Sequence, residues 1–312
     1  MSRHHTIEPT PSNLVWGYLD AAVKPILEIA SGDTVTLTSW PAGRIDRLPP
    51  DRSLHDKRHL EAMAICAPGP STHFIAGPVR VAGAMPGDVL QIDILAHELP
   101  MDWGFTVHVP LAGTLPDEFD EAAIIHSRID RARNVCILPW GKEIPLDPFF
   151  GVIATAPPPH WGRCSSMQPR AFGGNMDNKE LRPGSTLYLP VFNDGALFYA
   201  GDGHGVQGDG EVCVSALEIG LTGTFRLTVR KDLGYTRPFA ESPTHLVAIG
   251  LDLDLDRAAE QAVREMIDHI CRRTSLTRSQ AYMLCSLAAD LRVTQTVDGV
   301  KGCHMMLAKE RL

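Results

Sequence analysis

The densest group of side chains able to do chemistry lies in one acidic, glycine-rich segment, residues 201–211, which reads GDGHGVQGDGE. Asp202 and His204 stand two residues apart, so an extended backbone projects the carboxylate and the imidazole to the same side. Asp209 and Glu211 repeat that spacing. Five glycines in the segment remove the Cβ atoms that would hold the backbone away from an ion or a ligand. The pattern predicts a metal site.

The ligand types indicate which metal such a site would bind. Mixed oxygen and nitrogen ligation suits Zn²⁺ or another borderline divalent ion, whereas an all-oxygen site suits Ca²⁺ or Mg²⁺. His204 therefore favours zinc as the divalent metal. The acidic spacing and terminal glutamate of an EF-hand are missing, which excludes that calcium motif. One alternative stays open on spacing alone, because acidic residues among glycines are often solvated turns.

Several other positions carry reactive side chains. A glycine-led loop, residues 173–178, could bring Asp177 toward the same centre, although by itself it has the composition of an ordinary turn. His73 precedes an apolar run and is either a hydrogen-bonded structural residue or a ligand or proton carrier. Cys136 and Cys164 lack an evident feature that would lower a thiol pKa, so we expect structural roles. Serine-hydrolase elbows, amidase-signature serines and phosphate loops are missing from the sequence, which excludes those classes.

The elements that must position these residues are mainly strands. Residues 31–37, 86–92 and 183–189 each place a glycine turn before a strand with apolar residues at alternate positions. We therefore expect a mainly β (α+β) fold, with β-sandwich-like sheets in a catalytic region over residues 1–250. The stretches 41–70 and 101–116 are less regular, and we expect functional loops there.

The C-terminal residues 251–312 have a different pattern of apolar residues. Apolar residues at helical spacing predict a helix over 256–272, and the aspartates before it are suited to its N-terminus. A second helix is expected from Thr277, followed by a strand over 291–297 and a turn at residues 298–299. We expect these elements to form an α/β addition that covers the sheets and does not fold alone.

Composition limits the possible partners. The 312-residue chain has a net charge of −8 with scattered Lys and Arg, which argues against nucleic acid and anionic membranes as partners. The N-terminus lacks the apolar core of a signal peptide and later apolar runs are too short to span a bilayer, so a cytoplasmic location is expected. Seven widely spaced cysteines form neither a disulfide framework nor a zinc ribbon. A small neutral or cationic substrate fits this composition.

The sequence resembles the acetamidase/formamidase family. The resemblance is carried by residues 144–153 (IPLDPFFGVI), 173–177 (GGNMD), 184–191 (GSTLYLPV), 195–198 (GALF) and 201–211. It extends weakly through 73–79, 83–88 and 280–284, and so covers nearly the whole chain. It implies a β-rich fold with a C-terminal α/β part, hydrolysis of short amides such as formamide or acetamide to carboxylic acid and ammonia, a divalent metal, and homo-oligomers. Gly205-Val206 departs from the family, where Ala-Ala is frequent.

Together, the residues and the resemblance give a hypothesis for the site. The metal would be bound by Asp177, Asp202 and His204; the catalytic acid/base residues would be Glu211 and Asp209; and the substrate would be contacted by His73, Asn175 and Gln207. In this hypothesis a metal-activated water attacks the amide carbonyl, and Glu211 serves as base and then as acid, a role that Asp209 could exchange with it.

Two alternatives remain at this point. The first is hydrolysis of another non-peptide C–N bond on the same scaffold, in a lactam, a formylated amine or a urea-like compound. The second is a non-catalytic β-sandwich module that binds Ca²⁺, against which His204 argues because Ca²⁺ prefers oxygen ligands.

Overall fold

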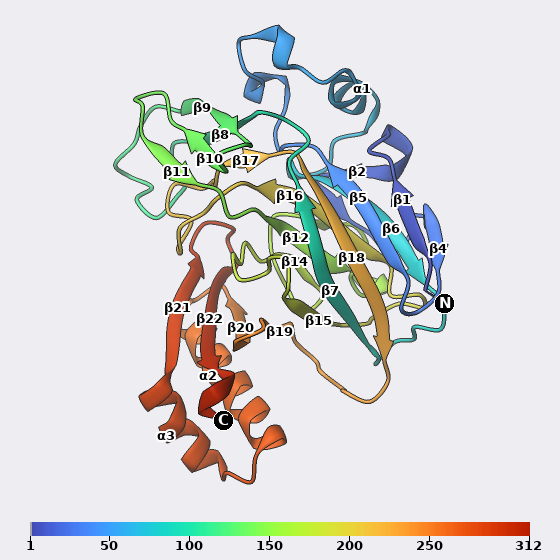
Figure 1. Cartoon of the computed structure of the whole chain (residues 1–312), viewed down its shortest axis with the longest axis vertical. Helices are drawn as coiled ribbons and strands as arrows, with labels where there is room; N and C mark the ends of the chain where they lie inside the picture. The colour runs from blue at the N-terminus through green and yellow to red at the C-terminus, as the bar shows by residue number, and fades with distance from the viewer. Residues whose placement is uncertain (1) are drawn as a thin grey trace.

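The computed structural model of the protein describes residues 2–312, and strands dominate it (Figure 1). Within that range nine strands form one sheet in the order β1, β5, β18, β7, β15, β19, β20, β22, β21. Their bounds are β1 His4–Ile7, β5 Thr34–Ser39, β7 Val89–Glu98, β15 Thr186–Pro190, β18 Leu221–Arg230, β19 Phe239–Glu241, β20 His245–Asp252, β21 Ala289–Gln295 and β22 Lys301–Ala308. The pair β1 and β5 is parallel, and the other neighbours run antiparallel.

A second large sheet faces the first. Across the described residues it has eleven strands, in the order β11, β10, β9, β8, β17, β16, β12, β14, with β6 paired to β16 and carrying β2 and β4. Their bounds are β2 Leu14–Trp16, β4 Leu27–Ile29, β6 Phe74–Val81, β8 Trp103–His108, β9 Ala123–Asp130, β10 Val135–Ile137, β11 Glu143–Pro145, β12 Phe149–Thr155, β14 Gly173–Asn175, β16 Phe198–His204 and β17 Glu218–Ile219. The short strands β3 Tyr18–Leu19 and β13 Cys164–Ser165 pair separately.

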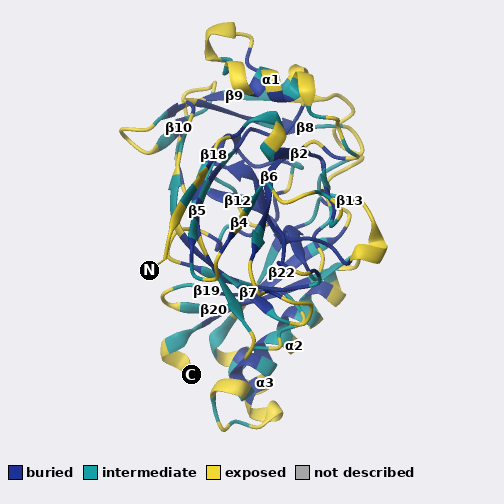
Figure 2. Cartoon of the chain, turned by 90° about the vertical axis from the view of Figure 1, so that its right-hand side faces the viewer, coloured by how far each residue is buried: buried dark blue, intermediate teal, exposed yellow. Residues whose placement is uncertain are grey.

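The main core lies between the two sheets. Phe150 of β12 and Phe198 of β16 meet Phe225 of β18 edge-on, with ring centroids 5.5 and 5.4 Å apart, an arrangement that aromatic rings favour. Figure 2 shows the buried segments gathered in the interior, with exposed segments at both ends of the molecule. The predicted mainly β fold with sandwich-like sheets is therefore confirmed. All three predicted turn-and-strand units are present as β5, β7 and β15.

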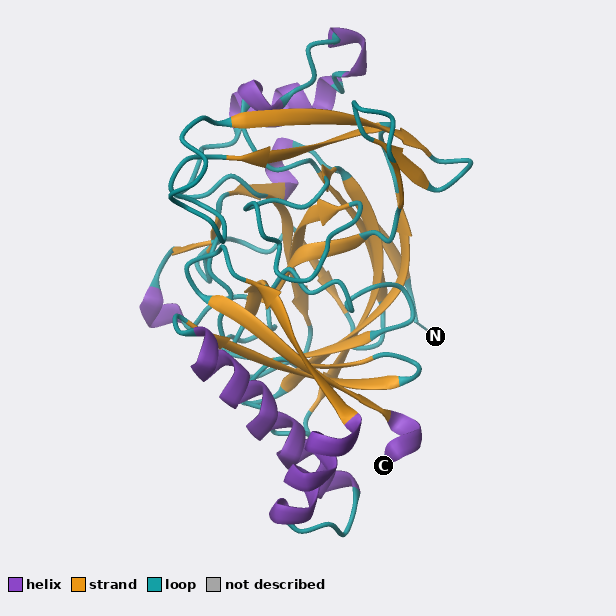
Figure 3. Cartoon of the chain, turned by 90° about the vertical axis from the view of Figure 1, so that its left-hand side faces the viewer, coloured by secondary structure: helices purple, strands orange, loops and turns teal. Residues whose placement is uncertain are grey.

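The C-terminal elements extend the first sheet and cover part of it with helices. Helices α2 Leu255–Arg273 and α3 Arg278–Ala288 confirm the two predicted helices, and β21 confirms the predicted strand. The side chain of Asp254 accepts a hydrogen bond from the backbone N–H of Arg257 and so caps α2. The apolar face of α2 packs on β20 and β22. Figure 3 shows the long helix lying against the strands at this end of the molecule. The expected boundary between residues 250 and 251 falls inside β20.

Two stretches are more regular than expected. Residues 41–70 contain helix α1 Lys57–Ile65 and residues 101–116 contain β8, so each of the two stretches expected to be functional loops is only partly a loop. Helix α1 begins at a cap, because the Asp56 side chain accepts from the backbone N–H of Arg58. Strand β8 is stabilised by pairing with β9, which its own sequence does not reveal. Over residues 2–312, every helix falls short of the length and apolar character needed to cross a membrane.

Candidate metal centre

The site is built around the C-terminal half of β16. This strand supplies Asp202 and His204, and it pairs with β12 on one side and with β17 on the other. The register of β17 places Glu218 directly opposite His204. Strand β14, the next one beyond β12, ends at Asn175, and Asp177 follows it. The ends of β14, β16 and β17 thus bring polar side chains to one place.

One group of ligand atoms converges on Nε2 of His204. This nitrogen lies 3.3 Å from Oδ2 of Asp202 and 3.5 Å from Oε1 of Glu218. Nε2 of His73 lies 3.9 Å from the same Asp202 oxygen. On the other side of the His204 ring, Nδ1 donates to Oε1 of Gln207 at 2.9 Å. Because Nδ1 donates to Gln207, Nε2 is the ring nitrogen that faces the neighbouring carboxyl groups, which is the arrangement typical of a metal-binding histidine.

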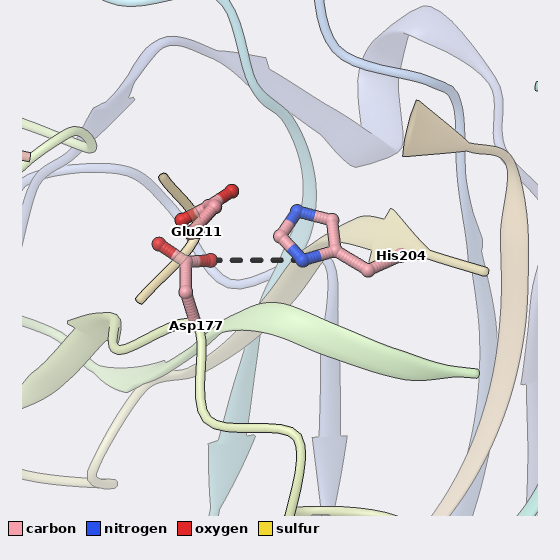
Figure 4. Close-up of side chains that lie close together, drawn as sticks. All are labelled: Asp177, His204 and Glu211. Atoms are coloured by element: carbon pink, nitrogen blue, oxygen red, sulfur yellow. Dashed lines mark ion pairs between the residues drawn. The ribbon is translucent and has the colours of Figure 1, made fainter. Parts of the chain in front are cut away.

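A second group of carboxyls lies on the Nδ1 side of the ring. Oδ1 of Asp177 is 3.8 Å from Nδ1, and Figure 4 shows the Glu211 carboxyl beside that of Asp177. Asn175 and Asp298 line the same cavity as Glu211. In this group, the buried oxygens without a hydrogen-bond partner among residues 2–312 are both carboxylate oxygens of Asp177, Oδ1 of Asn175, Oε2 of Glu211 and Oδ2 of Asp298. A buried acceptor left without a donor costs about 1–3 kcal/mol, so these oxygens call for a positively charged ligand.

Gly151 of β12 lies directly beneath the place where the two groups of side chains come together. A Cβ at this position would lie 2.4 Å from Oδ1 of Asp177, 2.7 Å from Oδ2 of Asp202 and 2.9 Å from Cε1 of His204. Only a residue without a side chain allows these atoms to approach the strand so closely. Asp177, Asp202 and Glu211 also have positive φ values of 46°, 59° and 45°. Such strain in non-glycine residues tends to gather at functional sites.

The electrostatics of the cluster show an excess of carboxyl groups. Burial, with the nearby Asp177 carboxyl adding to it, raises the pKa values of Glu211 and Asp298 well above their usual range. Burial also raises the pKa of Glu218, to about 8. Burial by itself would lower the pKa of His204, but the Glu218 and Asp202 carboxylates raise it to about 10. The carboxyl groups therefore cannot all ionise without added positive charge.

These residues fit a divalent cation. Asp202, His204 and Glu218 offer ligand atoms that all lie within 4.8 Å of one another, and Asp177, His204 and Glu211 form a second such set. Both sets are fully buried. A bound metal ion would account for three features of the cluster. They are the buried oxygens without a hydrogen-bond donor, the space that the missing side chain of Gly151 leaves, and the excess of carboxyl groups.

A cavity of about 290 Å³ opens onto the cluster. Its polar end is formed by His73, Asn175, Asp202, His204, Glu211, Glu218 and Asp298. Its apolar walls include Phe105, Val107 and Val109, and Gly43 and Arg47 also line it. The two stretches expected to be functional loops thus border the site, through residues 42–47 and 105–109. Since drug-sized ligands occupy cavities of about 300–1,000 Å³, this one suits a small molecule.

Most of the site residues predicted from the sequence come together here. Those at the cluster or its cavity are Asp177, Asp202, His204, Glu211, His73, Asn175 and Gln207. Gln207 contacts His204, and its Nε2 donates to the backbone carbonyl of Asp177 at 2.8 Å, so it joins the two groups of side chains. Asp209 lies elsewhere, in an ion pair with Lys179 at 3.0 Å.

The sequence reasoning missed two carboxyl groups of the cluster. Glu218 follows Ala216 and Leu217 and precedes Ile219, and a carboxylate inside an apolar strand is a signal of buried function that could have been used. Asp298 was interpreted as part of a turn, and it does lie in the turn between β21 and β22. Its local sequence, Asp298-Gly299, carries no further signal.

Comparison with known proteins identifies the family. The sequence profile of the Acetamidase/Formamidase family matches residues 23–161 and 162–308. A formamidase of Methylophilus methylotrophus is 28% identical over an alignment of 230 residues, with coverage of 57% of this chain and 54% of that protein. The chain thus spans about half the length of this relative.

Solved structures agree with this match. An acetamidase from Bacillus halodurans is 31% identical and superposes with a TM-score of 0.84, over 97% of this chain and 98% of that one. A gamma lactamase from Delftia acidovorans, 21% identical, shares the fold with a TM-score of 0.65, over 99% of this chain and 93% of that one. Because the family profile covers nearly the whole sequence, the chain belongs to the acetamidase/formamidase family.

Proposed function

We propose that this protein is a metal-dependent amidohydrolase that cleaves short aliphatic amides to a carboxylic acid and ammonia. The observation that carries the proposal is the buried cluster of converging carboxyl and imidazole groups at the end of a small cavity. Its family membership supports the choice of amides, since the relatives named above are a formamidase and an acetamidase.

Asp202, His204 and Glu218 would hold a divalent cation, and Asp177, beside the same imidazole, remains a proposed further ligand. The mixed nitrogen and oxygen donors favour Zn²⁺ over Ca²⁺ or Mg²⁺. When bound, such a cation polarises a carbonyl oxygen and lowers the pKa of water toward neutrality. Gln207 would keep the His204 ring in the orientation that leaves Nε2 free.

Glu211 would move the protons of the reaction. It lines the cavity, and its Oε2 has no hydrogen-bond partner within residues 2–312. It could therefore accept a proton from the attacking water and donate it to the departing nitrogen. Asp298 lines the same wall and would share this proton. We assign no proton transfer to Asp209, because Lys179 binds it away from the cavity.

The cavity would select the substrate by size. Phe105, Val107 and Val109 form an apolar wall that suits a short acyl chain. Asn175 and His73 lie at the polar end, where they would contact the amide group. His73 is oriented by Oγ of Ser166, 3.0 Å from its Nδ1. We also propose that the enzyme is cytoplasmic, since its cysteines are free thiols, as in reducing compartments, and that it works as a homo-oligomer.

A substrate panel tests the function. We expect ammonia release from formamide and acetamide, with rates falling as the acyl chain outgrows the cavity. If the protein instead opens a lactam without releasing ammonia, its substrates are lactams. If it hydrolyses a urea or a formylated amine in preference to simple amides, that compound class replaces the short amides as the proposed substrate. A protein that hydrolyses none of these compounds and copurifies with Ca²⁺ would instead be a binding module.

A further inference from the structure

The first sheet ends in an edge strand that is open to solvent. Strand β21 pairs with β22 on one side and is the terminal strand of the sheet, visible at the lower outer edge in Figure 1. Its far end is covered, because Gly210 donates to the backbone carbonyl of Thr294 at 3.0 Å and accepts from the N–H of Thr296 at 3.1 Å. Along residues 290–293, no other described segment pairs with the outer edge. Such an edge is a template for pairing with another strand.

Large apolar side chains surround this edge. Leu291 is 48% exposed, and Tyr282, Met283 and Leu287 on α3 are 61%, 56% and 86% exposed. A groove of about 930 Å³ between α2 and α3 is closed at one side by Leu291. Its apolar lining is Ala259, Val263, Ile267, Tyr282 and Leu291. Exposed apolar side chains on two neighbouring elements beside a groove are typical of an interaction site.

The charged side chains of β21 are complementary to those of β21 in a second copy of the chain. Asp290 and Arg292 flank Leu291, their side chains are 76% and 36% exposed, and within one chain they form an ion pair at 3.5 Å. Two copies related by a two-fold axis pair their edge strands antiparallel. If Leu291 lies opposite its own copy, Asp290 of each chain faces Arg292 of the other. A shift of the axis by one residue in either direction places Asp290 opposite Asp290, or Arg292 opposite Arg292, which is destabilising.

From this arrangement we infer that two copies of the chain form a dimer by antiparallel pairing of β21 with β21, centred on Leu291. The inference specifies the surface used by the homo-oligomer proposed above. In the dimer the first sheet becomes continuous across both chains, and the exposed apolar side chains of α3 lie beside the grooves at the junction. The same surface is used by both partners, as an isologous interface requires.

The interface would also stabilise the active site. Thr294 and Thr296 bind Gly210, which directly precedes Glu211, and Asp298 follows in the same chain segment. Arg292 forms an ion pair with Glu180, at 3.3 Å, on the segment that leads from Asp177. Pairing along residues 289–293 therefore holds the strand on which the acid/base end of the site depends.

A cysteine cross-link tests the register. Opposite residues in an antiparallel pair have Cα atoms about 4.5–5.5 Å apart, within the range of a disulfide. Leu291→Cys should therefore give a covalent dimer on a non-reducing gel after mild oxidation. Leu253→Cys, at a site 72% exposed between β20 and α2, is the matched control and should remain monomeric on the gel, as should the wild type with its own free cysteines.

Charge reversal tests whether the partner is a second copy of the chain. Asp290→Arg places arginine opposite Arg292 at two symmetric positions, and should raise the dimer dissociation constant at least ~10-fold in sedimentation velocity. The double variant Asp290→Arg, Arg292→Asp should restore dimerisation, since the opposite charges are exchanged. Circular dichroism confirms that each variant is folded.

A wild type that stays monomeric over the whole concentration range would overturn the inference. So would a Leu291→Cys protein that cross-links no more than the Leu253→Cys control, even if the wild type is oligomeric. These readouts are mass and covalent linkage, so they do not depend on amide hydrolysis. A dimer of the predicted geometry without hydrolytic activity would count against the proposed function alone.

Discussion

Replacing Gly151 by alanine tests whether the site depends on the close meeting of its two groups of ligands. The added Cβ would lie 2.4 Å from Oδ1 of Asp177 and 2.7 Å from Oδ2 of Asp202, against about 3.4 Å for an ordinary contact. Asp177 must then move by about 1 Å and Asp202 by about 0.7 Å. The backbone conformation of residue 151 imposes no further strain, because its φ is not positive.

Displacements of this size are large for a catalytic site. A misplacement of about 1 Å can reduce the rate about 100-fold, which corresponds to about 2.7 kcal/mol of transition-state stabilisation. Overpacking a tight interior costs a further ~1–3 kcal/mol of folding stability. We therefore expect Gly151→Ala to remain folded, to lose at least ~100-fold in kcat/KM for amide hydrolysis, and to bind metal more weakly.

The control uses another glycine of the same site region. Gly208 is exposed, and a Cβ there would meet no described atom within 4 Å. Gly208→Ala should keep its activity within about threefold. The assays are ammonia release, metal content by mass spectrometry and thermal unfolding by circular dichroism. If Gly151→Ala is as active and as metal-loaded as Gly208→Ala, the claim that Asp177 and Asp202 meet over Gly151 at a functional centre is refuted.

The other predictions concern proton transfer, the outlying carboxylate and acid stability. Glu211→Gln should keep its metal but lose ~10²–10⁴-fold in turnover, whereas His204→Ala should lose both metal and turnover; retained turnover in either variant contradicts the assigned role. Asp209→Asn removes only the ion pair with Lys179, so it should lower the unfolding free energy by less than ~1 kcal/mol and change turnover by less than about threefold. A larger loss of turnover would show that Asp209 takes part in proton transfer. Burial lowers the pKa of His59 from 6.5 to about 4. Between these two pH values the unfolded chain therefore binds a proton at His59 and the folded chain does not. Stability should therefore fall as the pH drops from 6.5 toward 4, by about 3 kcal/mol from this residue. Burial also lowers the pKa values of His97 and His304 to about 4, so His59→Phe should reduce the pH dependence in urea titrations by the share of one histidine, and an unchanged pH profile would show that His59 does not contribute.

Local patterns in the sequence predicted the parts of the structure that local interactions determine. Alternating apolar residues after a glycine turn identified β5, β7 and β15, and the apolar spacing behind the Asp254 cap identified α2. Asp202 and His204 lie in one strand and their side chains come together, as the two-residue spacing predicted, although the φ of 59° at Asp202 departs from the extended backbone that the prediction assumed. These features need only the geometry of one element.

Features that depend on pairing between distant segments could not be predicted in this way. Glu218 reaches the site through the register of β17 against β16, and Asp298 reaches it through the contact of the β21 end with Gly210. The spacing rule also failed for Asp209 and Glu211. Gly210 and Glu211 have φ values of 98° and 45°, so the backbone turns there, and the two carboxylates point in different directions.

The most direct test of the claim that amide hydrolysis depends on a bound metal is metal titration of the protein. Protein stripped of metal by a chelator would be reloaded with increasing Zn²⁺, and amide hydrolysis would be measured together with bound metal. We predict that activity is lost on stripping and returns in proportion to the metal bound, and that a Glu218→Gln protein binds the metal more weakly. Full amide hydrolysis by the metal-free protein would contradict the account.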